Sequence, residues 1–213
     1  MPRTDSKRLL VEGPNDGWVL AELMQANGVP WPRESEPVDI KPFGTNTPTK
    51  TRVVAQLKAV NLRILGVVLD ADDDAAATWI KVRSWFSESF LDLPEELPAN
   101  GFVSSPNESE ITLGIWIMPD NQSRGMLETL LMFLVPDDQD PLLKFAATAR
   151  DKAKKLGAPF KKVHEDKAQI HTWLAWQDEP GLRLYEAVQK GVLNPKSPHS
   201  KPFVAWFRKL FEL

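Results

Sequence analysis

The sequence predicts an α/β fold with a mainly parallel central sheet flanked by helices, and a helical C-terminal extension. Short apolar runs at 8–12, 38–41 and 64–69 alternate with segments at 15–27 and 49–60 whose apolar residues recur at helical spacing. Strands that alternate with helices in this way are joined by right-handed crossovers, which place the strands side by side and parallel. In addition, acidic residues stand directly at the ends of two of the apolar runs.

The remaining elements follow in chain order. We expect a helix from 74 to about 90, strands at 101–104 and 111–118 joined by a hairpin loop, and a short apolar helix at 126–134. Later helices are predicted at 140–156, 165–176, 182–190 and 203–213. We therefore divide the chain into an α/β core, residues 1–135, and a helical C-terminal region, residues 136–213, that packs on the core.

The composition is that of an ordinary globular chain. Its 213 residues include no cysteine, which excludes disulfides and cysteine-bound metals. The first residues are polar and no apolar run approaches about 18 residues, so we expect no signal peptide, no membrane span and a cytoplasmic location. The net charge of −3 argues against a protein that coats nucleic acid generally.

Four carboxylates are predicted to meet at one edge of the sheet. Glu12 ends the first strand and Asp16 lies in the first turn of the next helix, while Asp70 and Asp72 end the third strand. On an extended strand end, Asp70 and Asp72 would leave the same face. The carboxyl ends of parallel strands meet at a common edge, and a hard cation such as Mg²⁺ or Mn²⁺ is the usual reason to hold like charges together there.

Other acidic residues have simpler interpretations. Asp73 and Asp74 are best explained as charges that cap the following helix. Asp120 is a weak site candidate because Pro-Asp-Asn is ordinary turn chemistry. Glu128 is the only charge in its apolar helix, and its position just after a strand-ending loop favours a role in the site over a buried ion pair.

A basic run follows this acidic centre. Residues 150–167 carry seven lysines and arginines against three acids, as expected if metal-bound carboxylates act on a phosphate backbone that lysines hold. A solvated helix surface explains the run equally simply, and we favour it for the run taken alone. His164, His171 and His199 are too scattered for a metal set, so we interpret them as structural or surface residues.

The motifs resemble those of a known superfamily. Val11-Glu12-Gly13-x-x-Asp16 and, later, Asp70-Ala71-Asp72 look like the two motifs of the Toprim domain, found in type IA and II topoisomerases, bacterial primases and the overcoming-lysogenization-defect (OLD) family nucleases. The match is closest to the small stand-alone Toprim-like family DUF3226. That family combines these motifs with a Pro-Asp and a Gly-Met-Leu-Glu segment, here Pro119-Asp120 and Gly125 to Glu128, and closes as this chain does, with Trp206 and Leu210-Phe211.

This resemblance implies a Toprim-like Rossmannoid fold in which the acids gather around one or two Mg²⁺ (or Mn²⁺) ions. The metal ligands would be Glu12, Asp16, Asp70, Asp72 and Glu128. In the nuclease branch a lysine also stabilises the phosphate. We assign that role to Lys167, with Lys161 and Lys162 as rivals, so Glu12 and Lys167 are the expected catalytic residues.

The implied activity is metal-dependent phosphodiester hydrolysis of nucleic acid, DNA or RNA, of the OLD type, serving phage or mobile-element defence. The sequence has no Walker phosphate loop, so an ATPase partner would be a separate chain. Its single tyrosine, Tyr185, lies in an unremarkable helix, which argues against topoisomerase chemistry. Whether the chain forms a homo-oligomer is left open.

Two other functions remain open. The chain could be a non-catalytic regulatory protein that binds a metal or nucleotide and docks on a partner, for instance through its apolar segment at 203–211, although packing of that segment on its own domain is favoured. A nucleotidyl transferase or primase-like activity is the third.

Overall fold

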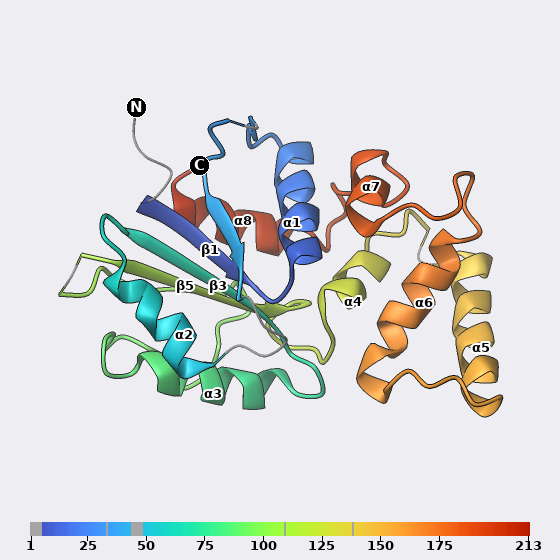
Figure 1. Cartoon of the computed structure of the whole chain (residues 1–213), viewed down its shortest axis with the longest axis horizontal. Helices are drawn as coiled ribbons and strands as arrows, with labels where there is room; N and C mark the ends of the chain where they lie inside the picture. Colours follow the sequence, from blue (N-terminus) through green and yellow to red (C-terminus); the bar gives the residue numbers. More distant parts are fainter. Residues whose placement is uncertain (1–5, 33, 44–48, 109, 138) are drawn as a thin grey trace.

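The central sheet is the framework on which the chain is built (Figure 1). The structure, a computed structural model, describes residues 6–32, 34–43, 49–108, 110–137 and 139–213. The polar residues 1–5, on which part of the expected location rested, lie outside these ranges. Five strands pair in the order β2-β1-β3-β5-β4. They are β1 (Lys7–Val11), β2 (Asp39–Pro42), β3 (Ile64–Asp70), β4 (Phe102–Val103) and β5 (Thr112–Met118).

The sheet is parallel except for β4, which pairs antiparallel with β5. This arrangement confirms the predicted mainly parallel sheet. The two most apolar strands, β3 and β5, lie in the interior of the sheet, because side chains on both of their faces must be covered. The edge strand β4 is only two residues long and is shorter than the strand predicted at 101–104.

Helices cover both faces of the sheet (Figure 1). One face carries α1 (Pro14–Ala26) and α8 (Lys201–Phe211), and the other carries α2 (Lys50–Ala55) and α3 (Ala75–Phe86). The helix predicted at 49–60 is shorter than expected, because α2 gives way to a 3-10 turn at Gln56–Lys58. The buried side chains on each face form a separate apolar cluster.

Four helices lie mostly beyond one end of the sheet (Figure 1). They are α4 (Leu127–Met132), at the end of the predicted core, and α5 (Pro141–Lys155), α6 (Glu165–Leu174) and α7 (Leu184–Gln189) of the C-terminal region, with a 3-10 turn at Lys162–His164 before α6. Their buried residues belong to the same apolar cluster as those of α1 and α8. The boundary at residue 135 stays a prediction, while the apolar core runs across it. Among the described residues, no helix combines the length and apolar character needed to cross a membrane.

The last helix, α8, rests on two facing glycines of the sheet. Gly66 of β3 and Gly114 of β5 are register partners. A Cβ atom on Gly114 would lie 2.3 Å from Cδ2 of Leu210, and one on Gly66 would lie 2.9 Å from Cζ of Phe211. The apolar side of α8 is buried in its own domain, as the sequence favoured, so it is not a free docking helix.

This close approach gives a stability prediction. Gly114→Ala should lower the free energy of unfolding by about 1–3 kcal/mol, because the buried Leu210 must shift to admit the new methyl group. Urea denaturation of Gly114→Ala, Leu210→Ala and the double variant measures it. The two single losses should not add, since Leu210→Ala removes the clash; strictly additive losses would contradict this packing.

Candidate functional site

The first two candidate acids lie where β1 and β3 end side by side. Leu10 and Val67 are register partners in these parallel strands, so Glu12 and Asp70 follow at neighbouring strand ends. The backbone N–H of Asp70 donates a hydrogen bond to Oε1 of Glu12 at 3.1 Å. The predicted meeting of the two strand-end acids is therefore present in the structure.

Helix α4 brings the third acid to the same edge. The backbone N–H of Leu127, the first residue of α4, donates to Oδ1 of Asp70 at 3.1 Å. Glu128 follows in the first turn and is only 5% exposed, although it is charged. Its Oε1 lies 2.8 Å from Nζ of Lys167. Glu128 thus has both the position that the sequence favoured and the ion pair that was the alternative.

Helix α6 is held against α4 by a second contact. Thr129 of α4 donates its hydroxyl to Oδ2 of Asp166, the residue before Lys167. The side chain of Lys167 is therefore directed to Glu128 by a helix whose first turn is fixed. All three lysines considered are exposed, and among the described residues Lys167 is the one of them that pairs with a candidate acid. Its catalytic role stays a prediction.

Asp16 combines a local role with proximity to the cluster. It accepts a hydrogen bond from the backbone N–H of Gly13 at 2.7 Å and so closes the N-terminus of α1. Its charge also raises the pKa of Asp70, and the charge of Glu128 raises its own. Asp16 therefore lies close enough to these acids to act on their charges.

Asp72 lies differently from what the sequence indicated. Strand β3 ends at Asp70, and Asp72 has a left-handed backbone with φ of 51°. Its N–H and C=O pair with Gly125 at 2.9 and 2.8 Å, which ties the loop after β3 to the loop before α4. The expectation that Asp70 and Asp72 leave one face of an extended strand is wrong for this reason. Asp72 is exposed, and its charge still raises the pKa of Glu12.

Burial and mutual repulsion make these acids hard to ionise. Burial, followed by the charges of Asp72 and Asp16, raises the pKa of Glu12 to about 7. Burial and the charges of Glu12, Asp16 and Glu128 raise the pKa of Asp70 well above its ordinary value. The pKa values of Asp16 and Asp72 are also raised, mainly because burial of Asp16 and partial covering of Asp72 remove hydration from their carboxylates. The protein has thus gathered more negative charge than its own cations neutralise.

Lys167 responds to the same field. Partial burial lowers its pKa, but the charge and hydrogen bond of Glu128, with the charges of Asp16 and Asp70, outweigh that effect and raise it. Lys167 therefore stays protonated beside these acids. We call the group formed by Glu12, Asp16, Asp70, Glu128 and Lys167 the acidic edge.

The donor chemistry of the acidic edge fits a hard divalent cation, since carboxylate oxygens are the ligands that such ions prefer. Within the described ranges, however, no three acidic or histidine side chains are placed so that they could hold one ion as they stand. Asp70 is turned to Leu127 and Glu128 to Lys167. A metal would therefore have to draw these side chains from their present partners.

Two other acids have the simpler roles that the sequence indicated. Asp74 caps α3 by accepting a hydrogen bond from the N–H of Ala77 at 3.0 Å. Asp120 closes a turn by accepting from the N–H groups of Gln122 and Ser123.

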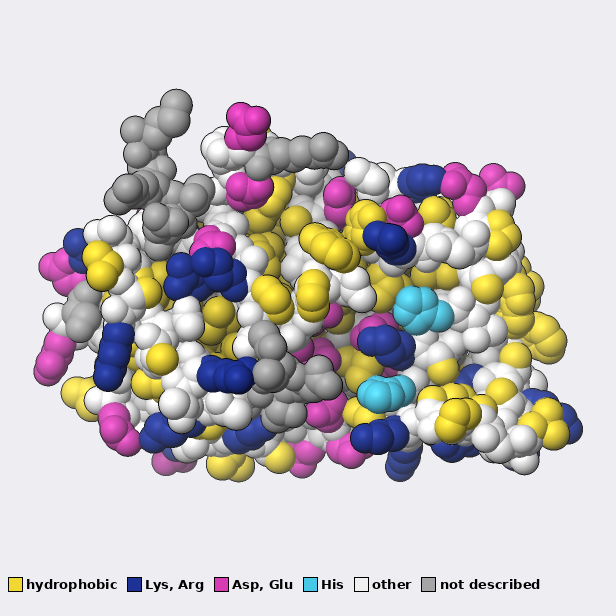
Figure 2. Space-filling view, in the orientation of Figure 1, with side chains coloured by type: hydrophobic (Ala, Val, Ile, Leu, Met, Phe, Trp, Pro, Cys, Tyr) yellow, Lys and Arg dark blue, Asp and Glu magenta, His cyan; other side chains and the backbone are white. Residues whose placement is uncertain are grey.

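Two histidines on either side of Lys167 lie near the site, which was not expected from the sequence. His164 precedes the first residue of α6, and His171 lies four residues after Lys167, on the same side of that helix. Figure 2 shows histidine and basic side chains next to each other over α6, close to acidic side chains. Both histidines are exposed, as predicted, but His164 lowers the pKa of Asp72 and Glu128 acts on the pKa of His171. Their spacing of three and four residues from Lys167 was the available signal.

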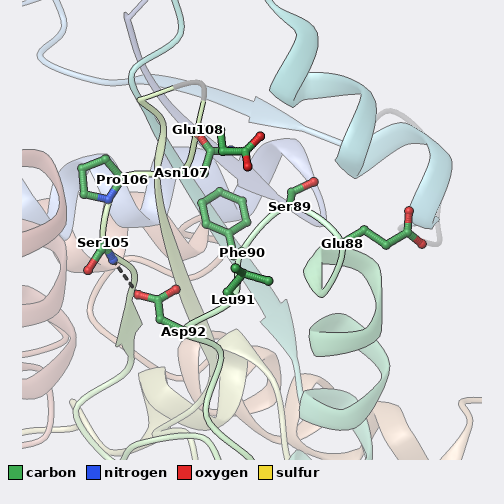
Figure 3. A pocket seen from close by; sticks show the side chains of 9 residues that line it. All are labelled: Glu88, Ser89, Phe90, Leu91, Asp92, Ser105, Pro106, Asn107 and Glu108. Atoms are coloured by element: carbon green, nitrogen blue, oxygen red, sulfur yellow. Dashed lines mark hydrogen bonds between the residues drawn. The ribbon is translucent and has the colours of Figure 1, made fainter.

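A hollow of about 460 Å³ lies away from the acidic edge (Figure 3). It is formed by the segment after α3 and the β4–β5 hairpin, at the amino ends of the parallel strands, and Phe90 and Leu91 contribute apolar surface to it. Three acidic side chains, Glu88, Asp92 and Glu108, also line it. This negative charge disfavours phosphate, and in parallel sheets ligands bind at the opposite, carboxyl ends of the strands.

The raised pKa of Glu12 predicts how stability depends on pH. Between pH 4.5 and about 7 the folded protein keeps the Glu12 proton that the unfolded chain releases, so the free energy of unfolding should fall as the pH rises. Thermal unfolding in a chelating buffer measures this decline, and Glu12→Gln should make it shallower. An equal pH dependence in both proteins would contradict the shift.

The chain matches no curated protein and no solved structure. The model of one family, described as "Protein of unknown function (DUF3226)", matches residues 6–212. That span contains every residue of the acidic edge and extends from β1 to the end of α8. The family expected from the motifs is thereby confirmed, and the chain belongs to the DUF3226 family.

Proposed function

We propose that this protein is a metal-dependent nuclease of the Toprim/OLD type, which hydrolyses phosphodiester bonds of DNA or RNA in the cytoplasm. The observation that carries the proposal is the acidic edge. Four carboxylates, supplied by the end of β1, α1, β3 and α4, act on one another's charges there, and a lysine from α6 pairs with one of them. Burial of so many like charges destabilises the folded protein, and such an arrangement is typical of sites where a cation or a substrate offsets that effect.

The ligands of the cation would be Glu12, Asp16, Asp70, Asp72 and Glu128. A bound Mg²⁺ or Mn²⁺ would supply an activated water and stabilise the leaving oxygen. The raised pKa values of Glu12, Asp16, Asp70 and Asp72 support this assignment, because burial and mutual repulsion raise them and the charge of a divalent cation would offset both effects.

Lys167 and Glu12 are the residues to which we give catalytic roles. The ammonium group of Lys167, 2.8 Å from Glu128, brings a positive charge to the edge where negative charge develops on a phosphate. Before a cation binds, Glu12 has a pKa of about 7 and can exchange a proton near neutral pH, so cation binding and loss of this proton are coupled. Both residues lie on fixed elements, directly after β1 and in the first turn of α6.

The Toprim part of the proposal rests on the positions of its motifs. The Val-Glu-Gly-x-x-Asp motif spans the turn from β1 to α1, and Asp-Ala-Asp follows the adjacent β3, so both motifs end at one edge of a mainly parallel sheet. We further propose that an ATPase on a separate chain activates the enzyme. The substrate would contact both the acidic edge and α6.

Cleavage assays test this function. Wild type should cut at least one member of a panel of supercoiled plasmid, single-stranded DNA and transfer RNA when Mg²⁺ or Mn²⁺ is present. Asp70→Asn should reduce the rate by at least about 100-fold, since it removes a central carboxylate. Lys167→Met should lose roughly 10²–10³-fold through lost charge stabilisation.

Glu108→Gln is the matched control, because Glu108 is an exposed acid at the other end of the sheet. Its cleavage rate should equal that of wild type. Cleavage that persists unchanged in Asp70→Asn would exclude the acidic edge as the active site. If neither protein cuts alone, the assay is repeated with a candidate ATPase partner.

One observation favours a non-catalytic metal- or nucleotide-binding protein as the second candidate. Glu12, Asp16 and Asp70 each accept a backbone hydrogen bond, and Glu128 pairs with Lys167, so the acids also join the elements of the edge. In that case Mg²⁺ or Mn²⁺ should raise the midpoint of thermal unfolding without any cleavage. Asp70→Asn should abolish the metal-dependent rise, whereas Glu108→Gln should keep it.

A further inference from the structure

A second hollow opens beside the acidic edge, between α1, α6 and α7. Its volume is about 190 Å³. Six residues line it: Asn15, Val19, His171, Arg183, Leu184 and Tyr185. Val19 and Leu184 are buried and form an apolar base, while the other four supply polar groups. We call this the Arg183 hollow.

The Arg183 hollow adjoins the acidic edge on two elements. Asn15 directly precedes Asp16 in the first turn of α1, and His171 lies one helical turn beyond Lys167 on α6. Tyr185 packs edge-on against Trp18 of α1, with ring centroids 5.7 Å apart, and this contact helps to fix α7 at α1. The hollow and the acidic edge are therefore neighbours along both α1 and α6.

The guanidinium of Arg183 has no carboxylate within ion-pair distance in the part of the chain that the structure describes. Its Nη1 donates a hydrogen bond to the hydroxyl of Tyr185 at 3.5 Å. The nearby Glu186 accepts a hydrogen bond from the backbone N–H of Arg183 at 2.7 Å. Lys167, by contrast, is already paired with Glu128.

This set of groups suits a phosphate. A guanidinium offers several N–H donors in a planar fork that matches phosphate oxygens, and the amide of Asn15 and the hydroxyl of Tyr185 add further donors. Partial burial lowers the pKa of His171, and the ring of this residue can also donate an N–H. The volume exceeds that of several water molecules, at about 30 Å³ each in the liquid.

We propose that the Arg183 hollow binds a phosphate group of a single nucleic acid strand, next to the phosphate that is cleaved at the acidic edge. The inference rests on the proposed function and adds to it a second contact point, which sets the position of the strand. The phosphate oxygens accept hydrogen bonds from Arg183 and Asn15. An internal phosphodiester and a terminal phosphate share this chemistry.

The salt dependence of binding tests this contact without cleavage. The probe is a short fluorescent single-stranded DNA in EDTA, and its affinity is measured from low to high salt for wild type, Arg183→Gln and Arg183→Lys. Each phosphate contact contributes about 0.7 to the slope of log affinity against log salt, so Arg183→Gln should lower that slope by about 0.7. It should weaken binding roughly tenfold at low salt. Arg183→Lys keeps the charge and should keep the slope.

Arg63→Gln is the matched control, since it removes the same charge from an exposed arginine at the amino end of β3, where it pairs with Glu110. It should leave slope and affinity close to wild type.

DNA strands with and without a 5′-phosphate distinguish binding of an internal phosphodiester from binding of a terminal phosphate. An effect of Arg183→Gln on both strands indicates an internal phosphate, and an effect on the phosphorylated strand alone indicates a terminal one.

The results separate this inference from the proposed function. If wild type cleaves but Arg183→Gln binds like Arg63→Gln, the inference is overturned and the nuclease proposal stands. If wild type never cleaves but Arg183→Gln alone lowers the slope, the phosphate contact is supported and the nuclease proposal fails. Absence of strand binding by wild type overturns the inference.

Discussion

The burial of Glu12 and Asp70 at adjacent strand ends is the constraint on which the rest of the site depends. Two carboxylates so placed repel each other and lose hydration, which is why their pKa values rise. Backbone N–H groups offset part of this cost, one from Asp70 to Glu12 and one from Leu127 to Asp70. The start of α4 is thereby fixed by the ends of β1 and β3, and the acidic edge is assembled from backbone as well as side chains.

Helix α4 in turn connects the sheet with the helical region. It contacts Asp70 through its first N–H, Lys167 through Glu128 and Asp166 through Thr129. Helix α6 of the C-terminal region is therefore part of the candidate site. This short helix of six residues sets the distance between the acids of the sheet and the ammonium group of Lys167 on α6. A substitution that displaces α4 would alter both at once.

The sequence was sufficient to predict the sheet and the meeting of the two strand-end acids, because alternating apolar runs and helical spacing are local signals. It failed for Asp72, whose left-handed backbone depends on pairing with Gly125, far along the chain. Whether His171 lies near the acidic edge depends on the rotation of α6 about its axis. The hydrogen bond between Thr129 and Asp166 fixes that rotation. Arg183 belongs to no sequence motif. It stands out only in the structure, where it has no carboxylate partner among the described residues.

The position of α8 has a consequence for how the chain is made. The face formed by Gly66 and Gly114 of the two central strands is covered by residues 203–211, more than ninety positions after β5 begins. During synthesis this apolar face stays open until α8 has left the ribosome, so the core cannot close progressively from the N-terminus. Contacts so distant along the chain slow folding. A nascent chain that stalls before α8 would expose this face and become a substrate for chaperones.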